Sequence, residues 1–271
     1  MDWGTMSRAG RDAAYNNGAA VTDSAALGQA RRQASAAFRG AHGSALDLPY
    51  GERERNKWDL FPGTETAAPC LVFIHGGYWQ MNNREAFACI AEGMAAHGWS
   101  VALPGYTLAP DAGLTAIAAE IRQALDWLTR NGRSYGIGGA IVLSGWSAGA
   151  HLAALSLDHP AVAAGLAISG VYELGPLRDT YLNDKLRLTD DEIETLSPLR
   201  LRVVPKPLAI AYGSNEVPAL VNGSRMLHAR RAAAHAPGAL VPVAGADHFT
   251  LLHELRSPSG LLVRQALALV L

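Results

Sequence analysis

The stretch from Val142 to His151 constrains this chain most, because it runs from an apolar strand pattern through Gly-Trp-Ser-Ala-Gly into an Ala-rich helix pattern. A glycine on each side of such a serine permits a turn so tight that the serine is strained and its hydroxyl is exposed. Gly145 and Gly149 hold those two positions. The sequence therefore predicts a nucleophile elbow with Ser147 as the nucleophile. A tight turn with an ordinary serine is the alternative, and the strand-to-helix context disfavours it.

A second motif lies upstream, where the buried-strand pattern at 70–74 ends in the sequence His-Gly-Gly-Tyr-Trp. Glycines let the backbone approach a substrate oxygen, and backbone N–H groups can stabilise the charge of a tetrahedral intermediate. We expect an oxyanion hole formed by N–H groups of Gly76, Gly77 and Tyr78, together with that of Ala148 after the predicted nucleophile.

The general base is predicted at His248, which follows a strand pattern and precedes a Leu-rich helix pattern. A histidine is expected on that loop when a serine elbow is present, and the acid should precede it along the chain. A surface histidine capping the last helix is the alternative. His75 is expected to brace the glycine-rich loop by hydrogen bonds. The remaining histidines lie in helix patterns or in less suitable loops: His97, His151, His159, His228, His235 and His253.

The acid is predicted at Glu216, in the loop that follows the strand pattern at 207–212. A carboxylate is needed to orient the imidazole and stabilise the imidazolium, and Asn215 cannot supply one. Asp247 is an alternative acid, although adjacent side chains on a loop rarely meet in the required geometry. Glu216 could instead be a charge at the start of the helix that begins near Pro218.

These motifs resemble the kynurenine formamidase (arylformamidase)-like branch of the hormone-sensitive-lipase-like α/β-hydrolases. The resemblance rests on His-Gly-Gly-Tyr-Trp at 75–79 and Gly-Trp-Ser-Ala-Gly at 145–149. Tyr-Thr-Leu-Ala-Pro-Asp at 106–111 is similar to a Y-R-L-A-P-E segment of the superfamily, with Thr107 and Asp111 as departures. Shorter similar segments lie at 15–17, 48–51, 59–61 and 197–199.

The resemblance covers nearly the whole chain and implies a serine hydrolase acting on an N-formyl aryl amide such as N-formylkynurenine. An acid three residues after the glycine at 213 is usual in the family, and Glu216 holds that place. The same signature occurs in general carboxylesterases, so a short-chain carboxylesterase is the first alternative. A non-catalytic ligand-binding member of the fold and a lyase with the same triad are more remote alternatives.

The rest of the chain alternates between strand and helix patterns. Strands are expected at 57–61, 70–75, 99–103, 140–143, 165–169, 208–212 and 240–243, and helices at 84–97, 114–130, 220–234 and 251–271. This alternation predicts the α/β-hydrolase fold, with a mostly parallel central sheet, helices on both faces and active residues at the carboxyl ends of the strands. We expect one domain over residues 1–271.

Two segments are not needed for the sheet. Residues 1–50 are helical, notably over 24–38, and carry no core-strand pattern, while 171–200 follow a core strand. We expect both to form a small cap. Tyr78, Trp79, Trp146 and Tyr172 are expected to line an aromatic substrate pocket. Alternatively, the two tryptophans only wedge the loops against the sheet. Aromatic walls and a short cap favour a small aryl substrate.

Composition excludes several other classes of function. The net charge is −1 without a basic block, which argues against nucleic acid and anionic membranes as partners. The polar start of the chain lacks a signal-peptide pattern, and two cysteines make no disulfide framework, so a cytoplasmic location is expected. No metal-ligand spacing or phosphate-binding glycine loop is found, and we expect no cofactor. The expected partner is a small-molecule substrate, and a homodimer is left open.

Overall fold

The computed structural model describes residues 3–270, which are organised around one eight-stranded sheet of order β1-β2-β4-β3-β5-β6-β7-β8. β1 pairs antiparallel with β2, and β2 pairs antiparallel with β4, whereas all other neighbours are parallel. The strands are β1 Ala45–Pro49, β2 Lys57–Phe61, β3 Cys70–Ile74, β4 Ser100–Pro104, β5 Ile141–Trp146, β6 Val162–Ile168, β7 Leu208–Gly213 and β8 Leu240–Val243.

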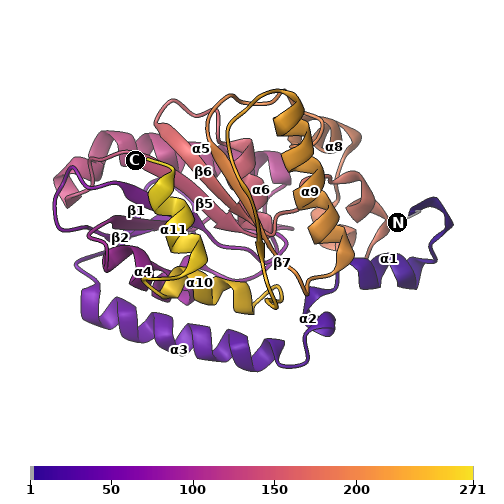
Figure 1. The fold of residues 1–271 in the computed structure, drawn as a ribbon, viewed down its shortest axis with the longest axis horizontal. Helices are drawn as coiled ribbons and strands as arrows, with labels where there is room; N and C mark the ends of the chain where they lie inside the picture. The colour runs from indigo at the N-terminus through magenta and orange to yellow at the C-terminus, as the bar shows by residue number, and fades with distance from the viewer. Residues whose placement is uncertain (1–2, 271) are drawn as a thin grey trace.

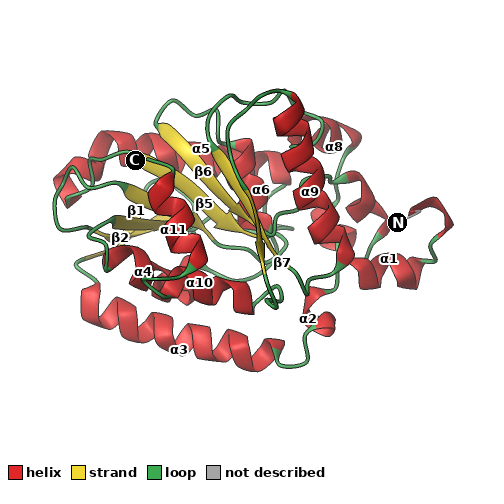
Figure 2. Ribbon diagram, in the orientation of Figure 1, coloured by secondary structure: helices red, strands yellow, loops and turns green. Residues whose placement is uncertain are grey.

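Helices cover both faces of this sheet (Figure 2). One face packs against α5 (Leu114–Asn131), α6 (Ala148–Leu155) and α9 (Pro218–Ala233). The other packs against the 3-10 helix η2 (Arg84–Ile90), α4 (Ala91–Ala95), α10 (His253–Arg256) and α11 (Leu261–Ala268). Central strands are buried on both faces and therefore read as continuous apolar runs. This is the α/β-hydrolase fold that the sequence predicts.

Residues 3–50 divide into three parts. α1 (Arg8–Ala14) and α2 (Asn17–Ala20) follow the short 3-10 helix η1 (Trp3–Thr5), and α1 contacts the 3-10 helix η4 (Gly175–Asp179). α3 (Ser24–His42) instead runs along the outside of η2, at the bottom of Figure 1. The expectation that residues 1–50 are not needed for the sheet is corrected by β1, which pairs with β2 and extends the sheet. β1 is an edge strand whose alternate residues are exposed, so its sequence lacks the apolar run of a core strand.

Two predicted helices are interrupted. The pattern at 84–97 forms η2 followed by α4, and the pattern at 251–271 forms the 3-10 helix η5 (Thr250–Leu252), α10 and α11. The interruption after α10 includes Pro258, which lacks an N–H, and Gly260, where a Cβ would lie 2.1 Å from the carbonyl oxygen of Glu254. Leu271 lies outside the described residues. The segment after β6 contains η4, α7 (Asn183–Leu186) and α8 (Asp190–Leu196), and the 3-10 helix η3 (Gly132–Tyr135) follows α5.

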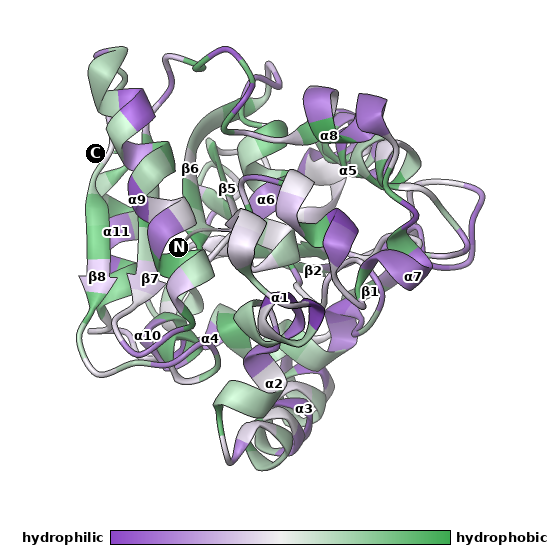
Figure 3. Cartoon of the chain, turned by 90° about the vertical axis from the view of Figure 1, so that its right-hand side faces the viewer, coloured by the Kyte–Doolittle hydropathy of each residue, from purple (hydrophilic) through white to green (hydrophobic). Residues whose placement is uncertain are grey.

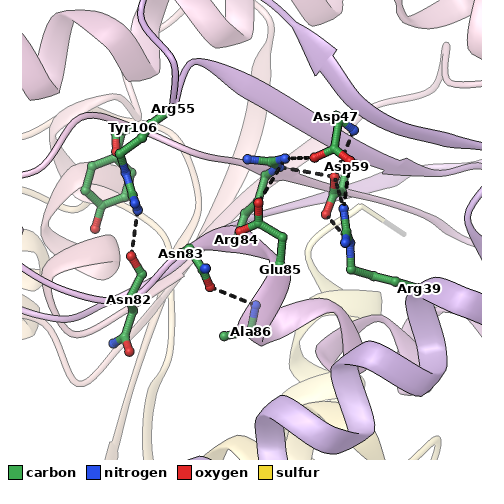
Figure 4. A network of polar contacts seen from close by, with 10 residues as sticks. All are labelled: Arg39, Asp47, Arg55, Asp59, Asn82, Asn83, Arg84, Glu85, Ala86 and Tyr106. Carbon is green, nitrogen blue, oxygen red and sulfur yellow. Dashed lines mark hydrogen bonds and ion pairs between the residues drawn. The ribbon is translucent and has the colours of Figure 1, made fainter.

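A buried ion-pair network joins α3, β1, β2 and η2 (Figure 4). Asp59 on β2 is fully buried, and its carboxylate accepts hydrogen bonds from the guanidinium groups of Arg39 and Arg84 at 2.8 and 3.1 Å. Both arginines also pair with Asp47, and Arg84 pairs with Glu85. The network therefore connects the N-terminal helix α3 to the edge of the sheet.

The β8 edge of the sheet is short and includes a proline. Pro242 lies opposite Tyr212 on β7 and is exposed. The N–H groups of Ile210 and Ser214 donate to the carbonyls of Ala239 and Val243. Within residues 3–270, no helix is long and apolar enough to span a bilayer.

Candidate active site

Ser147 occupies the turn between β5 and α6 in a strained conformation, with φ 58° and ψ −119°. The flanking glycines are required sterically. A Cβ on Gly145 would lie 2.2 Å from the carbonyl oxygen of Gly149, and a Cβ on Gly149 would lie 2.0 Å from that of Ile74. The Ser147 N–H donates to the carbonyl of Ile168 at 2.8 Å, which ties the turn to β6. The surrounding chain therefore holds this residue in a region that non-glycine residues rarely adopt.

The loop at 75–82 lies directly against this turn. A Cβ on Gly76 would come within 2.9 Å of the Ser147 Cβ. Three consecutive residues of the loop have positive φ: Gly77 at 123°, Tyr78 at 49° and Trp79 at 57°. Ala148 is the first residue of α6, so its N–H has no acceptor within the helix. The predicted oxyanion-hole residues thus come from two adjacent elements at the carboxyl ends of β3 and β5.

His248 and Glu216 form a buried pair, with 3.1 Å between His248 Nδ1 and Glu216 Oε2. The Glu216 side chain is fully buried, and its other oxygen accepts hydrogen bonds from the Ser169 hydroxyl and from the Gly213 N–H at 2.7 Å. These donors fix the carboxylate, so that it can orient the imidazole with Nδ1 protonated and Nε2 free to take a proton.

Asp247, the alternative acid, is committed elsewhere. Its Oδ1 accepts hydrogen bonds from the N–H groups of Phe249 and Thr250, at 2.8 and 2.9 Å. Asn215 donates from its side chain to the carbonyl of Gly245 at 3.1 Å. Among the acids weighed from the sequence, the geometry therefore favours Glu216 as the partner of His248.

Trp146 contacts the loop that carries His248. Its indole Nε1 donates to the carbonyl of His248 at 2.8 Å, and the two rings lie 4.6 Å apart. The ring centroids of Trp146 and Phe87 on η2 lie 5.7 Å apart. Trp146 therefore packs the His248 loop against the face of the sheet that η2 covers. This agrees with the alternative in which the tryptophan wedges a loop against the sheet.

The other aromatic candidates are also deeply buried. Trp79 packs edge-on against His151 of α6, with ring centroids 4.9 Å apart. Burial lowers the pKa of His151 to about 4. Burial also raises the pKa of Tyr78 and of Tyr172, and the Glu216 carboxylate adds to both shifts. The contact of Tyr78 and Tyr172 with substrate stays a prediction.

His75 braces the loop, as expected from the sequence. Its Nδ1 donates to the carbonyl of Gly76 at 2.9 Å, and its ring stacks on Tyr106 with centroids 4.3 Å apart. The Tyr106 hydroxyl donates to the His75 carbonyl at 2.9 Å. Burial lowers the pKa of His75 to about 3, so the imidazole is neutral at physiological pH.

Residues 8–17 and 175–188 meet beside the 75–82 loop. The Tyr181 N–H donates to Asp12 Oδ1 at 2.8 Å, and Gln80 of the loop donates to the carbonyl of Leu182 at 2.8 Å. Figure 3 views this end of the molecule, with α1 and α7 in front of the sheet. Ser147 and His248 are 2% and 3% exposed. Of the two segments expected to form a cap, residues 8–17 and 175–188 lie beside the 75–82 loop, whereas α3 packs against η2.

Sequence reasoning missed three contributors. Ser169 follows β6 and donates to Glu216, and the rule that active residues gather at carboxyl strand ends could have found it. Arg31 of α3 places its guanidinium 4.0 Å from the centre of the Phe87 ring. Asn17 donates to the Tyr78 hydroxyl at 2.9 Å. For Arg31 and Asn17 no local pattern signals the contact. Across residues 3–270, no cluster of three His, Cys, Asp or Glu residues could hold a metal ion.

Comparison with known proteins agrees with this geometry. The BD-FAE family model matches residues 59–159. The chain is 26% identical to a kynurenine formamidase of Danio rerio over 83% of its length and 81% of that protein. It is 28% identical to a kynurenine formamidase of Salmo salar over 80% of its length and 79% of that protein. The chain has the α/β-hydrolase fold and is similar to the kynurenine formamidase-like branch of that superfamily.

Solved structures share the fold of this chain. A protein of Silicibacter sp. TM1040, provisionally described as a thioesterase, superposes with a TM-score of 0.82 at 29% identity, covering 94% of this chain and 98% of that one. An esterase of Mycobacterium marinum superposes with a TM-score of 0.75 at 20% identity, covering 92% and 90%, and so shows the shared fold. The α/β-hydrolase is thus a serine hydrolase-type enzyme of the esterase and amidase kind.

Proposed function

We propose that this enzyme hydrolyses a small aryl formamide of the N-formylkynurenine type through an acyl-enzyme. The observation that carries the mechanism is the pairing of His248 with a buried carboxylate, Glu216, beside a strained serine elbow. The observation that carries the substrate is the similarity to two kynurenine formamidases over about four-fifths of each chain.

In the first step, Ser147 attacks the formyl carbonyl while His248 Nε2 takes the hydroxyl proton. Glu216 holds the imidazole through Nδ1 and stabilises its positive charge. The N–H groups of the 75–82 loop (those of Gly76, Gly77 and Tyr78) and of Ala148 stabilise the oxyanion. His248 then gives its proton to the departing aryl amine, which leaves a formyl ester on the serine.

In the second step, water attacks the formyl ester with His248 as base, and formate is released with the serine restored. Every bond change uses the substrate, water and these side chains, so the proposal needs no cofactor. A small-molecule substrate is the partner, and the buried free thiols of Cys70 and Cys89 support a proposed cytoplasmic location.

A short-chain carboxylesterase is the second candidate. It is supported by an esterase of Mycobacterium tuberculosis that is 33% identical over 44% of this chain and 31% of its own length. Both reactions use the same groups, because an ester and a formamide pass through similar tetrahedral intermediates. The size of the acyl pocket and the recognition of the leaving group would separate them.

Steady-state hydrolysis of N-formylkynurenine and p-nitrophenyl acetate, with Ser147→Ala as control, tests the proposal. We expect kcat/KM to be orders of magnitude higher for the formamide and both activities to vanish in Ser147→Ala. Good ester turnover without formamide cleavage would identify a carboxylesterase. Binding of N-formylkynurenine with no turnover by the unmodified enzyme would identify a ligand-binding member of the fold.

A further inference from the structure

Asn17 connects the N-terminal segment to the 75–82 loop. It begins α2, is 5% exposed, and donates from Nδ2 to the Tyr78 hydroxyl at 2.9 Å. The Tyr78 hydroxyl in turn donates to the backbone carbonyl of Tyr15 at 2.6 Å. The buried Tyr78 hydroxyl therefore both accepts and donates a hydrogen bond, and both partners lie more than 60 positions earlier in the chain.

Tyr78 needs such an anchor because of its backbone. Its φ of 49° and that of Trp79, 57°, are conformations that non-glycine residues avoid unless the surroundings impose them. Contacts within the loop hold its other part. Asn82 donates to the carbonyl of Gly76 at 3.1 Å, and the N–H groups of Gln80 and Met81 donate to that of Gly77. None of these contacts reaches the Tyr78 side chain.

The segment that holds Tyr78 is itself ordered by short-range bonds. The N–H groups of Asn17 and Ala20 donate to the backbone carbonyls of Tyr15 and Asn16, each at 3.1 Å. The Asn16 side chain accepts separately from the Ala19 N–H, further along α2. Tyr15 is 7% exposed and packs edge-on against Trp3. The Tyr78 phenol is thus fixed by a rigid turn rather than by a loose terminus.

We propose that Asn17 is a positioning residue, which orients the backbone N–H groups of Gly77 and Tyr78 toward the oxyanion by fixing the Tyr78 side chain. The inference rests on the proposed function and adds the N-terminal turn to the catalytic machinery. Asn17 acts through Tyr78 and does not touch the reacting atoms. Its contribution therefore belongs to the transition state, where the oxyanion develops, and not to substrate binding.

The test compares Asn17→Ala with Tyr78→Phe and with the double variant. Removing an oxyanion donor outright costs about 10²–10³ in kcat. Misplacing one should cost less, and we expect kcat to fall about tenfold with KM unchanged within about twofold. A trifluoromethyl ketone, which mimics the tetrahedral intermediate, should bind about tenfold more weakly. Tyr78→Phe removes the contact that Asn17→Ala breaks, together with the hydrogen bond to the Tyr15 carbonyl. The double variant should therefore be no worse than Tyr78→Phe alone.

Asn16→Ala is the matched control, because it makes the same change one residue earlier and removes the cap of α2 while leaving the Tyr78 contact in place. We expect kcat within about twofold of the unmodified enzyme. An equal loss in Asn16→Ala and Asn17→Ala would overturn the proposal, since any disturbance of the segment would then suffice. A rise in KM alone in Asn17→Ala, or independent effects in the double variant, would also overturn it.

The same assay separates this inference from the proposed function. If the unmodified enzyme turned over neither N-formylkynurenine nor p-nitrophenyl acetate, or if Ser147→Ala kept activity, the proposed function itself would fail. If turnover depended on Ser147 while Asn17→Ala matched the unmodified enzyme in kcat, only the positioning role would fail. Circular dichroism and thermal unfolding of each variant confirm that folded enzymes are compared.

Discussion

Trp146 donates a hydrogen bond from its indole to the backbone carbonyl of His248 at 2.8 Å, so the residue before the elbow serine holds the loop that carries the imidazole. The imidazole is therefore fixed from two sides, by Glu216 at Nδ1 and by Trp146 at the backbone. In the sequence, Trp146 is only the variable position of a G-x-S-x-G motif.

Trp146→Phe should keep an aromatic ring against His248 while removing the indole donor. Loss of one hydrogen bond is worth about 1 kcal/mol, which corresponds to about fivefold in a rate. We expect kcat to fall by about that factor with little change in KM. Trp127→Phe, on the outer helix α5, is the control and should leave kinetics unchanged. Equal kinetics for both variants would show that Trp146 does not position the imidazole.

Glu216→Gln keeps the shape of the side chain but removes its negative charge. Because the imidazolium is then no longer stabilised, kcat should fall by about 10²–10⁴. Asp247→Asn provides the matched control, since asparagine keeps the oxygen that accepts from the N–H groups of Phe249 and Thr250. We expect it to retain most activity. A loss below about threefold in Glu216→Gln would move the assignment to Asp247 or another carboxylate.

Asp59→Asn should destabilise the protein. The change leaves the buried guanidinium group of Arg84 and the half-buried one of Arg39 without their shared buried carboxylate, which costs about 3–5 kcal/mol of unfolding free energy. Asp47→Asn removes a carboxylate that is half exposed, so its cost should stay near or below about 1 kcal/mol. Urea unfolding measures both. Equal costs would mean that burial of Asp59 does not set the strength of this network.

Acid should weaken the fold through its buried histidines. Burial lowers the pKa of His75 to about 3 and that of His151 to about 4. Between about pH 6.5 and pH 4 the unfolded chain therefore binds protons that the folded chain does not. Stability contributed by each neutral histidine is full above pH 6.5 and falls by about 1.4 kcal/mol per pH unit below it.

The measurement is urea unfolding at pH 7 and pH 5 for the unmodified enzyme and for His151→Gln, whose amide can still donate to the carbonyl of Leu196, as His151 Nε2 does at 2.7 Å. We expect the pH-dependent loss to shrink by about 2 kcal/mol in His151→Gln. His253→Gln, at an exposed position, should lose as much as the unmodified enzyme. An undiminished loss in His151→Gln would show that His151 is not a source of the pH dependence.

The sequence predicts the elements whose chemistry is local. Gly145 and Gly77 are required by close approaches to Gly149 and Met81, four residues further along the chain, so each motif carries part of its own geometry. Gly149 and Gly76 are required where the two motifs meet, at Ile74 and at Trp146, and the strand order predicted from the sequence brings these places together. Alternating apolar runs likewise predict the parallel sheet and its order of strands and helices. Glu216 follows from its position after a strand, since active residues gather at carboxyl strand ends.

The parts that the sequence does not predict depend on distant partners. β1 is a half-exposed edge strand with no apolar run, and only its pairing with β2 defines it. Asn17 and Arg31 lie in helices whose sequences show no sign that their side chains reach Tyr78 and Phe87. Such contacts arise from the packing of whole elements, which local periodicity does not encode.

Pro242 affects how the molecule can associate. The carbonyls of Ala239, just before β8, and of Val243 at its end accept from N–H groups of β7 and the residue that follows it. Because backbone groups alternate along a strand, those of Pro242 point away from β7. An incoming strand would find no N–H at that position, and the strand has only four residues. Continuation of the sheet from one molecule into the next, and with it strand-mediated aggregation, is therefore blocked at this edge.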